Sequence, residues 1–497
     1  MQYLGAVDQG TTSTRFIIFD RGGAIVASHQ LEHTQIFPRP GWVEHDPMEI
    51  WANTQRCITE ALKKARLKGR DLSGIGITNQ RETIVAWEKE SGKVYHNAIV
   101  WQDLRTSAYI EELKDSPQGP IIEEKTGLVL SPYFGGSKIA WLLEHVDGLR
   151  EDAESGKAVF GTIDSWLAYQ FSGKILHITD ASNASRYLLM NIETLSWDDE
   201  LLEIFSIPKG SLPMIVPSSG MVYGHTAKDG PFGSEVPIAG ILGDQQAALF
   251  GQACFKPGMG KSTYGTGCFL LVNTGFSLPR SRNGLLTTVA YRIGDEKPVY
   301  ALEGSVAVAG SLVQWARDNL KLVESAQQLD REALTVTDSG GVYVVPAFSG
   351  LFAPYWRSDA RGVIAGLTAF VTKAHLCRAI LESTAFQAYD IFKAMESDSG
   401  IKTTELKVDG GMTNSEPLME FQADLLGVPV IRPQVVETTA LGAAFAAGLS
   451  VGVYKDLDEL ASYWKERKRW ESTMDDETRD EKVRFWKKAV ERTLEWV

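Results

Sequence analysis

The first thirty positions contain short apolar runs separated by polar and glycine-rich turns. Apolar runs occupy Tyr3–Val7, Arg15–Asp20 and Ala24–His29, and short turns rich in glycine and hydroxyl residues separate them. Runs of this length joined by tight turns predict an antiparallel meander of three strands. The chain therefore opens on a β-sheet.

The apolar period changes to that of a helix after position 46. Asp46 is a typical cap residue, Pro47 fits the first turn, and Glu49 completes the signal for a helix start. Apolar residues then recur on one helical face, and we expect the helix to stop before Gly69. The next strand is predicted at Leu72–Thr78.

A strand followed by a helix is predicted again near the middle of the chain. Ile238–Leu242 has the pattern of a short buried strand, and Gln245–Phe250 consists of good helix formers. Gly243 frees the backbone between them, and we expect Asp244 to cap the helix. The positive helix end favours the ionised carboxylate, which can accept a hydroxyl proton as a general base. The alternative is that Asp244 is only a cap.

The second half of the chain repeats the theme of the first. It begins with two strands around a glycine-rich turn and continues as mixed α/β. Strands are predicted at Lys261–Tyr264, Cys268–Asn273, Leu285–Tyr291, Val299–Leu302 and Leu406–Val408, and helices at Ser305–Leu320, Ala374–Met395, Glu416–Leu426 and Thr439–Gly448. We interpret the two halves, residues 1–250 and 251–497, as duplicated domains that share an extensive contact.

The charge balance narrows the class of partner. The net charge is −13, which disfavours binding to nucleic acid. The basic run Lys465–Arg469 contains Glu466, and we interpret it as a solvated helix face. No apolar run is long enough to span a bilayer, and no leader of the secretory type precedes Tyr3. The four cysteines form no metal-spaced pair, so a reduced, cytoplasmic protein is expected.

Two turns have the composition of phosphate-binding hairpins. In Asp8–Arg15, backbone N–H groups and hydroxyls can face an anion, Arg15 can pair with a phosphate, and Asp8 can hold a metal through water. Ser262–Gly267 is a similar turn in the second half, so the two together can grip a nucleotide from both sides. Each has the alternative of an ordinary hairpin with a polar loop.

Two further stretches suit ligands. Arg81-Glu82, with Trp101 and Tyr133, combines hydrogen-bonding groups with apolar walls, which suits a small polyol. The alternative is a surface ion pair beside core aromatic residues. The glycines of Asp409-Gly410-Gly411 allow a flat base to lie against the backbone, although an ordinary turn between strand and helix explains them equally well.

Taken together, these stretches resemble the FGGY family of carbohydrate kinases. The resemblance covers most of residues 3–450, and the stretches Ile77–Glu82, Thr179–Arg186 and Gly243–Gln252 are most similar to the members that phosphorylate glycerol. Further stretches that carry it are Asp8–Arg15, Gly41–Trp51, Trp101–Arg105, Tyr264–Phe269, Gly304–Gln314, Tyr355–Gly362 and Asp409–Gly411.

The resemblance implies two actin-like (ribonuclease H-like) ATPase domains that flank a catalytic cleft, and transfer of the γ-phosphoryl group of ATP to glycerol. It implies Asp244 as general base, and Mg²⁺ held near Asp8 and Asp244 through water. The residues expected at glycerol are Arg81, Glu82, Trp101, Tyr133, Asp244, Gln245 and Phe269. Those expected at the nucleotide are Thr11, Thr12, Ser13, Arg15, Thr266, Gly310, Gln314, Gly411 and Asn414. A homodimer or homotetramer is also expected.

Two rival functions and one regulatory expectation stay open at this point. The rivals are a kinase for another polyol or sugar, and an ATPase of the actin or chaperone kind that binds protein. Some bacterial family members bind fructose 1,6-bisphosphate on a glycine-rich loop that ends in arginine. The matching loop, residues 228–235, has Asp229, Pro231 and Glu235 instead, so we expect no response to that ligand.

Overall fold

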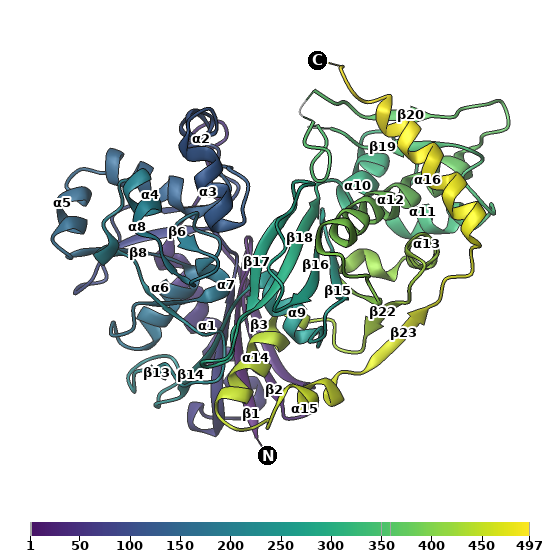
Figure 1. Cartoon of the computed structure of the whole chain (residues 1–497). Helices are drawn as coiled ribbons and strands as arrows, with labels where there is room; N and C mark the ends of the chain where they lie inside the picture. The colour runs from purple at the N-terminus through teal and green to yellow at the C-terminus, as the bar shows by residue number, and fades with distance from the viewer. Residues whose placement is uncertain (1, 349, 358, 497) are drawn as a thin grey trace.

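The structure is a computed structural model that describes residues 2–348, 350–357 and 359–496. It contains two lobes, each built on a large mixed sheet (Figure 1). The strands of the first large sheet are drawn in purple to teal, and those of the second run from teal to yellow. The chain ends lie far apart, with the N-terminus at the foot of the first lobe.

The sheet of the first lobe has six strands in the order β13-β14-β5-β1-β2-β3. The strands β1, β2 and β3 pair antiparallel, which confirms the predicted meander, and β5 and β14 add to it in parallel. Their bounds are Tyr3–Gln9 (β1), Ser13–Asp20 (β2), Ile25–Glu32 (β3), Leu72–Asn79 (β5), Gly224–His225 (β13) and Pro237–Gly243 (β14).

The sheet of the second lobe repeats this arrangement. Its order is β17-β18-β16-β15-β21-β22-β23, with β15 and β16 antiparallel, and β21 and β22 added in parallel. The bounds are Met259–Tyr264 (β15), Cys268–Gly275 (β16), Leu286–Tyr291 (β17), Val299–Val306 (β18), Glu405–Asp409 (β21), Val430–Pro433 (β22) and Glu466–Trp470 (β23). The duplication predicted from the sequence is therefore visible in the topology.

Helices cover both faces of the first sheet, and one of them comes from the end of the chain. On one face lie α1 (Pro47–Ala65) and α6 (Ile163–Phe171). On the other lie α9 (Asp244–Gly251) and α14 (Thr438–Ser450). The backbone of α14 packs closely against the backbones of β5 and α9. A Cβ at Gly76 of β5 would be 2.1 Å from the carbonyl oxygen of Ala443 in α14, and a Cβ at Gly442 of α14 would be 1.9 Å from the carbonyl oxygen of Ala247 in α9.

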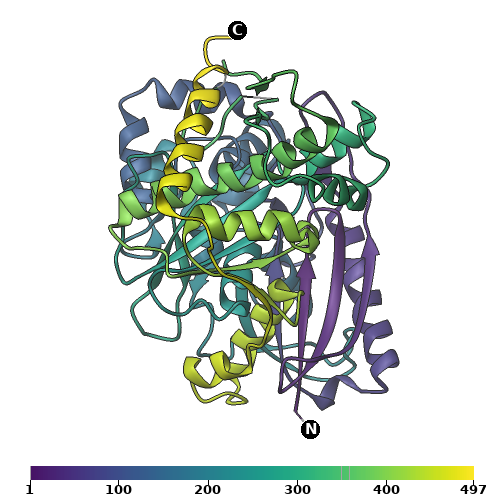
Figure 2. The same ribbon diagram turned by 90° about the vertical axis from the view of Figure 1, so that its right-hand side faces the viewer.

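The second sheet is covered on its outer face by three helices, α12 (Lys373–Ser399), α13 (Glu416–Leu426) and α16 (Asp476–Glu491), which face the viewer in Figure 2. On its inner face, Leu271 and Ala301 share a core with Leu249 of α9. The helix α9 therefore packs against both sheets, and the two lobes share one continuous apolar contact, as expected from the absence of a linker.

Smaller elements fill the outer part of the first lobe. A four-stranded sheet has the order β4-β7-β6-β8, and helices surround it. The bounds are Glu44–His45 (β4), Ile84–Glu88 (β6), Ala98–Ile99 (β7), Ala158–Thr162 (β8), Ser107–Lys114 (α2), Gln118–Thr126 (α3), Gly135–His145 (α4), Leu149–Glu154 (α5), Ala181–Ala184 (α7) and Asp199–Ile204 (α8).

In the part of the chain that the structure describes, the remaining β-strands and α-helices form three two-stranded sheets and three helices. They are β9 (Ile178–Asp180) with β12 (Met214–Val216), β10 (Met190–Asn191) with β11 (Ser196–Trp197), β19 (Tyr343–Val345) with β20 (Val363–Ala365), and α10 (Gly310–Asp318), α11 (Ala326–Ala333) and α15 (Leu457–Tyr463). All four cysteines are buried and free. Within the described residues, no helix is long and apolar enough to cross a membrane.

Three predictions about elements are wrong. Lys465–Arg469 is not a helix face, because Glu466–Trp470 forms the edge strand β23, whose charges discourage pairing with another chain. The helix expected from Ser305 begins at Gly310, since Ser305 and Val306 still pair with β16. Asp244 is the first residue of α9 and not its cap: the cap position belongs to Gly243, and no side chain caps this helix.

Candidate functional site

Asp244 lies where the first lobe's last large strand becomes a helix. The strand β14 ends at Gly243, and α9 starts at Asp244. One carboxylate oxygen, Oδ1, accepts the backbone N–H of Gln245 at 2.7 Å and lies 3.1 Å from Nε of Arg81. The side chain is still 30% exposed, so a ligand can reach it. The geometry therefore offers an oriented and accessible carboxylate, as a general base requires.

Arg81, which contacts Asp244, belongs to a buried network of ion pairs. Arg81 makes a bidentate pair with Glu303 at 2.6 and 2.8 Å, and Arg186 binds both Glu82 at 2.7 Å and Glu303 at 3.2 Å. Burial opposes the charge on Glu303, but Arg186 and Arg81 outweigh it and lower its pKa to about 2. Burial raises the pKa of Glu82, although both arginines oppose that shift. The network joins the first lobe to β18 of the second.

Arg81 and Glu82 are therefore less available to a ligand than the sequence indicates. Their side chains are 2% and 1% exposed, and their charges are already paired. Glu82 also has φ of +61°, a left-handed conformation that costs a residue with a Cβ and that concentrates at functional sites. Their direct contact with a polyol stays a prediction, whereas the contact of Arg81 with Asp244 is visible in the structure.

A cavity of about 690 Å³ lies beside the two hairpins and is lined by four of the seven predicted polyol residues, Trp101, Tyr133, Gln245 and Phe269. Arg81, Glu82 and Asp244 are not among the described residues that line it. Trp101 and Tyr133 meet edge to face with their ring centroids 5.4 Å apart. The described residues that line it include Thr11, Thr12, Trp101, Tyr133, Phe134, Gln245, Thr263, Gly265, Thr266, Gly267, Phe269 and Glu303. Aromatic walls with few polar groups suit a small ligand that has both C–H and O–H surfaces.

Gln245 presents its amide to this cavity in a defined sense. Nζ of the buried Lys261 donates to Oε1 of Gln245 and, at 3.1 Å, to Oγ1 of Thr263. Because the amide oxygen is bound, the NH₂ group of Gln245 is left to donate to a ligand. Burial lowers the pKa of Lys261 to about 8, and the carboxylates of Asp409 and Asp244 oppose that shift.

A second cavity of about 360 Å³ adjoins the first through Gly265 and Thr266, which line both. Gly310, Gln314, Gly411 and Asn414, predicted to contact the nucleoside, all line it, so the fold brings together five predicted nucleotide residues when Thr266 is included. Backbones approach closely here: a Cβ at Gly310 would lie 2.5 Å from the carbonyl oxygen of Gly265. The two cavities therefore lie next to each other at the hairpin of the second lobe.

The hairpin of the first lobe is arranged differently. Thr11 accepts a hydrogen bond from the indole of Trp101 at 3.0 Å and faces the first cavity with Thr12. Ser13 is bonded to Gln30, and Arg15 donates to Asp8 at 2.8 Å and to Glu437 at 2.6 Å. Among the described residues, Asp8, Ser13 and Arg15 line neither cavity. Their contact with phosphate or metal stays a prediction.

The acidic groups around Arg15 fit a hydrated divalent cation. Burial raises the pKa of Asp8, Arg15 opposes this, and Glu437 and Asp244 raise it further, so the three carboxylates are close enough to repel one another. A cation among them relieves that repulsion. The described residues contain no cluster of three or more side chains placed to ligate a metal directly, and Mg²⁺ retains several waters and needs only one or two carboxylates.

Sequence reasoning missed four residues of this site: Arg186, Lys261, Glu303 and Glu437. Arg186 ends the stretch Thr179–Arg186, which was noticed only as a family resemblance, and Lys261 directly precedes the hairpin at Ser262–Gly267. Glu303 lies 222 positions from its partner Arg81, so no local pattern could reveal the pair.

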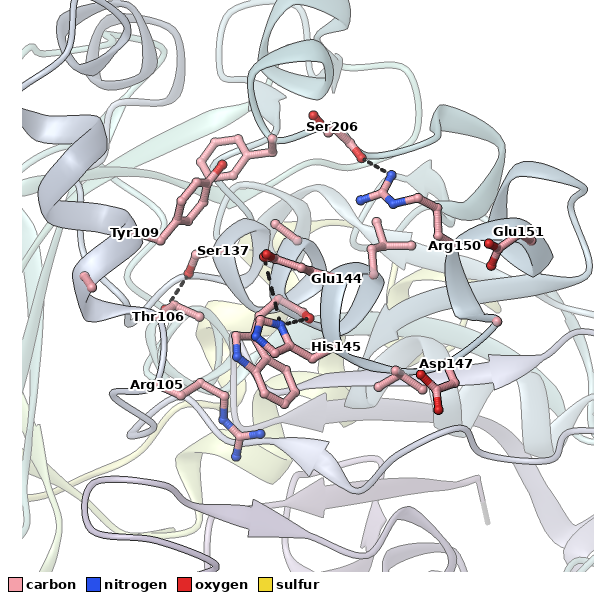
Figure 3. A pocket seen from close by; sticks show the side chains of 17 residues that line it. Arg105, Thr106, Tyr109, Ser137, Glu144, His145, Asp147, Arg150, Glu151 and Ser206 are labelled. Carbon is pink, nitrogen blue, oxygen red and sulfur yellow. Dashed lines mark hydrogen bonds and ion pairs between the residues drawn. The ribbon is translucent and has the colours of Figure 1, made fainter.

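A separate cavity of about 730 Å³ opens on the outer side of the first lobe and is shown in Figure 3. Arg150 and His145 line it together with Glu144, Asp147 and Glu151. Charges of both signs surround it, and it contains none of the residues predicted for a substrate or nucleotide. It is not the site described above.

Comparison with known sequences decides the family. Residues 3–251 match the N-terminal domain of the FGGY family of carbohydrate kinases, and residues 260–451 match its C-terminal domain. The chain belongs to the FGGY family. A glycerol kinase of Pseudarthrobacter chlorophenolicus is 57% identical over 501 residues, which cover 100% of this chain and 99% of that relative. A glycerol kinase of Roseiflexus sp. is 54% identical with the same coverage.

Solved structures agree on the FGGY fold. The crystal structure of Plasmodium falciparum glycerol kinase with ADP has a TM-score of 0.95 and 40% identity, and covers 99% of this chain and 98% of that one. Gluconate kinase from Lactobacillus acidophilus has a TM-score of 0.87 at 23% identity, over 99% of this chain and 96% of that one, and is similar in fold alone. The expected fold of two actin-like domains, inferred from the resemblance, is confirmed.

Proposed function

We propose that this FGGY enzyme transfers the γ-phosphoryl group of ATP to a terminal hydroxyl of glycerol, giving sn-glycerol 3-phosphate. The observation that carries the proposal is the accessible carboxylate of Asp244, which directly precedes Gln245 in the chain. Gln245 lines a polyol-sized cavity, and this cavity adjoins a second one that is lined by the glycines 265, 310 and 411. The identity of 57% with glycerol kinases supports glycerol as the substrate.

In this mechanism Asp244 accepts the proton of the attacking hydroxyl, and Arg81 holds the carboxylate in place. The NH₂ group of Gln245 and the phenol of Tyr133 orient the polyol, while Trp101 and Phe269 contact its carbon edge. Phosphoryl transfer needs positioning and charge neutralisation more than covalent chemistry. Closure of the lobes would exclude water that could otherwise take the phosphoryl group.

The hairpins at Thr11–Ser13 and Gly265–Gly267 are proposed to hold the phosphates, and Arg15 is proposed to move from Glu437 to a phosphate oxygen when ATP binds. Mg²⁺, held near Asp8 and Asp244 through water, would neutralise charge on the phosphates. We also propose a homodimer or homotetramer in the cytoplasm. The four buried thiols are consistent with a reducing compartment, and sedimentation of the purified protein would give the oligomeric state.

A coupled assay of ADP release tests the proposal. Glycerol with ATP and Mg²⁺ should give turnover that xylulose and gluconate do not match. Preference for either sugar substrate would instead support another FGGY activity. ADP release that does not depend on glycerol would support an ATPase of the actin or chaperone kind and overturn the proposal.

A further inference from the structure

Lys138 is a buried lysine whose side chain donates three hydrogen bonds to one short loop. It is the fourth residue of α4 and has no exposed surface. Its Nζ donates to the carbonyl oxygens of Pro132 at 2.7 Å, Tyr133 at 2.6 Å and Phe134 at 3.0 Å. An ammonium group has three protons, so this set of carbonyls satisfies it completely.

The surroundings of Lys138 do not suggest that it serves to neutralise a nearby carboxylate. Burial lowers its pKa to about 7, while Glu82 and Asp103 act in the opposite direction and Arg105 adds to the lowering. None of its hydrogen bonds among the described residues goes to a carboxylate. A buried charge is costly unless it is hydrogen-bonded. Here the hydrogen bonds of the ammonium group all go to the carbonyl groups of three consecutive residues.

Those backbone groups belong to the loop that carries the aromatic wall of the polyol cavity. Tyr133 and Phe134 both line the cavity, and their ring centroids are 5.2 Å apart. The guanidinium of Arg186 lies over Phe134 at 5.1 Å. Three successive carbonyls that converge on one nitrogen fix the curvature of the backbone, and with it the direction in which the Tyr133 side chain leaves.

We propose that Lys138 is a positioning residue for the polyol, and that it acts through Tyr133 by fixing the backbone of residues 132–134. The inference rests on the proposed phosphorylation of glycerol. It assigns to Lys138 an effect on polyol binding, and neither contact with substrate nor a part in proton transfer.

The test compares Lys138→Met with the matched control Lys114→Met, which removes an exposed lysine of α2. Among the described residues, Lys114 is paired only with Glu111 of its own helix. The Michaelis constants for glycerol and for ATP are measured for each variant, together with kcat and the melting temperature. We expect Lys138→Met to raise the glycerol KM about tenfold and leave the ATP KM within about twofold, because only the polyol wall shifts. The control should change neither.

A double-mutant cycle with Tyr133→Phe separates positioning from general loss of structure. If Lys138 acts through Tyr133, the double variant should show a glycerol KM clearly below the product of the two single effects. Multiplicative effects, or equal increases in both Michaelis constants, would overturn the inference.

Lys138→Arg provides the second variant should Lys138→Met not fold. Its planar guanidinium cannot place three donors on carbonyls that converge on one point, so the glycerol KM should rise while the charge is retained. A wild-type glycerol KM in Lys138→Arg would contradict the inference. Absence of glycerol phosphorylation by the wild type would instead contradict the proposed function, so the two failures are distinguishable.

Discussion

The two hairpins occupy the same place in the two lobes, yet their cross-strand pairs differ in charge. In the first, Asp8 faces Arg15 in the second pair from the turn. In the second, the equivalent pair is Thr263 and Phe269. Among the described residues, the charged pair lines neither cavity, and its Arg15 also donates a hydrogen bond to Glu437, whereas the neutral pair lines the polyol cavity. The duplicated backbone thus supplies the frame, and single side chains divide the chemistry between the lobes.

The largest expected effect is at Asp244, which lies where β14 meets α9 and belongs to neither hairpin. Asp244→Asn keeps the shape but removes the base, so kcat should fall by about 10²–10⁴-fold while glycerol binding changes less. The matched control is Asp199→Asn, at the exposed first residue of α8. A near-normal kcat in Asp244→Asn would mean that Asp244 is not the general base.

The next effect concerns Glu303, through which the second lobe enters the ion network of the first. Its pKa is lowered from 4.5 to about 2 in the folded protein, so the unfolded state binds more protons between these values. The resulting stabilisation, about 3 kcal/mol, is present above pH 4.5 and is lost as the pH falls towards 2. Chemical denaturation at several pH values should show a smaller loss over this range in Glu303→Gln than in the wild type. Parallel curves would contradict the assignment.

Variants of the two cross-strand pairs should separate the substrates. Arg15→Met should raise the KM for ATP about tenfold or more, because a charge-assisted hydrogen bond to phosphate is removed. Phe269→Ala should raise the KM for glycerol and leave that for ATP nearly unchanged, because it removes only an apolar wall. If both variants affect the same substrate, the proposed division of labour between the hairpins is wrong.

The smallest expected effect is none at all. In the loop 228–235, Lys228 lies 3.5 Å from Glu235, so the loop's lysine is paired with a carboxylate. The negative carboxylates of Asp229 and Glu235 repel a phosphate dianion, whereas the backbone N–H groups of the two hairpins can donate hydrogen bonds to one. Millimolar fructose 1,6-bisphosphate should therefore leave glycerol phosphorylation unchanged. Saturable inhibition that disappears when residues 228–235 are altered would refute this.

The fold was largely predictable because local patterns determine it. The apolar run at Tyr3–Val7 and the cap at Asp46 mark elements that their own residues stabilise, and Asp46 indeed accepts the N–H of Met48. Lys465–Arg469 was mispredicted because closely spaced charges are compatible with a helix face and with an edge strand. Only pairing with β22, which follows from tertiary structure, decides between them.

The site was predictable in outline and not in its supporting contacts. Residues at turns, such as Thr266 and Gly411, reveal themselves through glycine and hydroxyl composition. Glu303 and Lys138 lie in regular elements without any unusual composition, and their importance follows from partners brought close by the fold. The same holds for Arg15, whose sequence context indicates phosphate but gives no sign of Glu437.

The return of α14 to the first sheet has a consequence for synthesis on the ribosome. Leu4, Ala6 and Ile17 on that face of the sheet are covered partly by Ala443 and Phe445. A nascent chain that has emerged only as far as residue 251 contains every strand of the first sheet but lacks this cover. The first lobe therefore completes its core only after about nine-tenths of the 497 residues have been translated. We infer that a fragment cut near Gly251 would leave an apolar face open, so the two lobes fold as partners and not in succession.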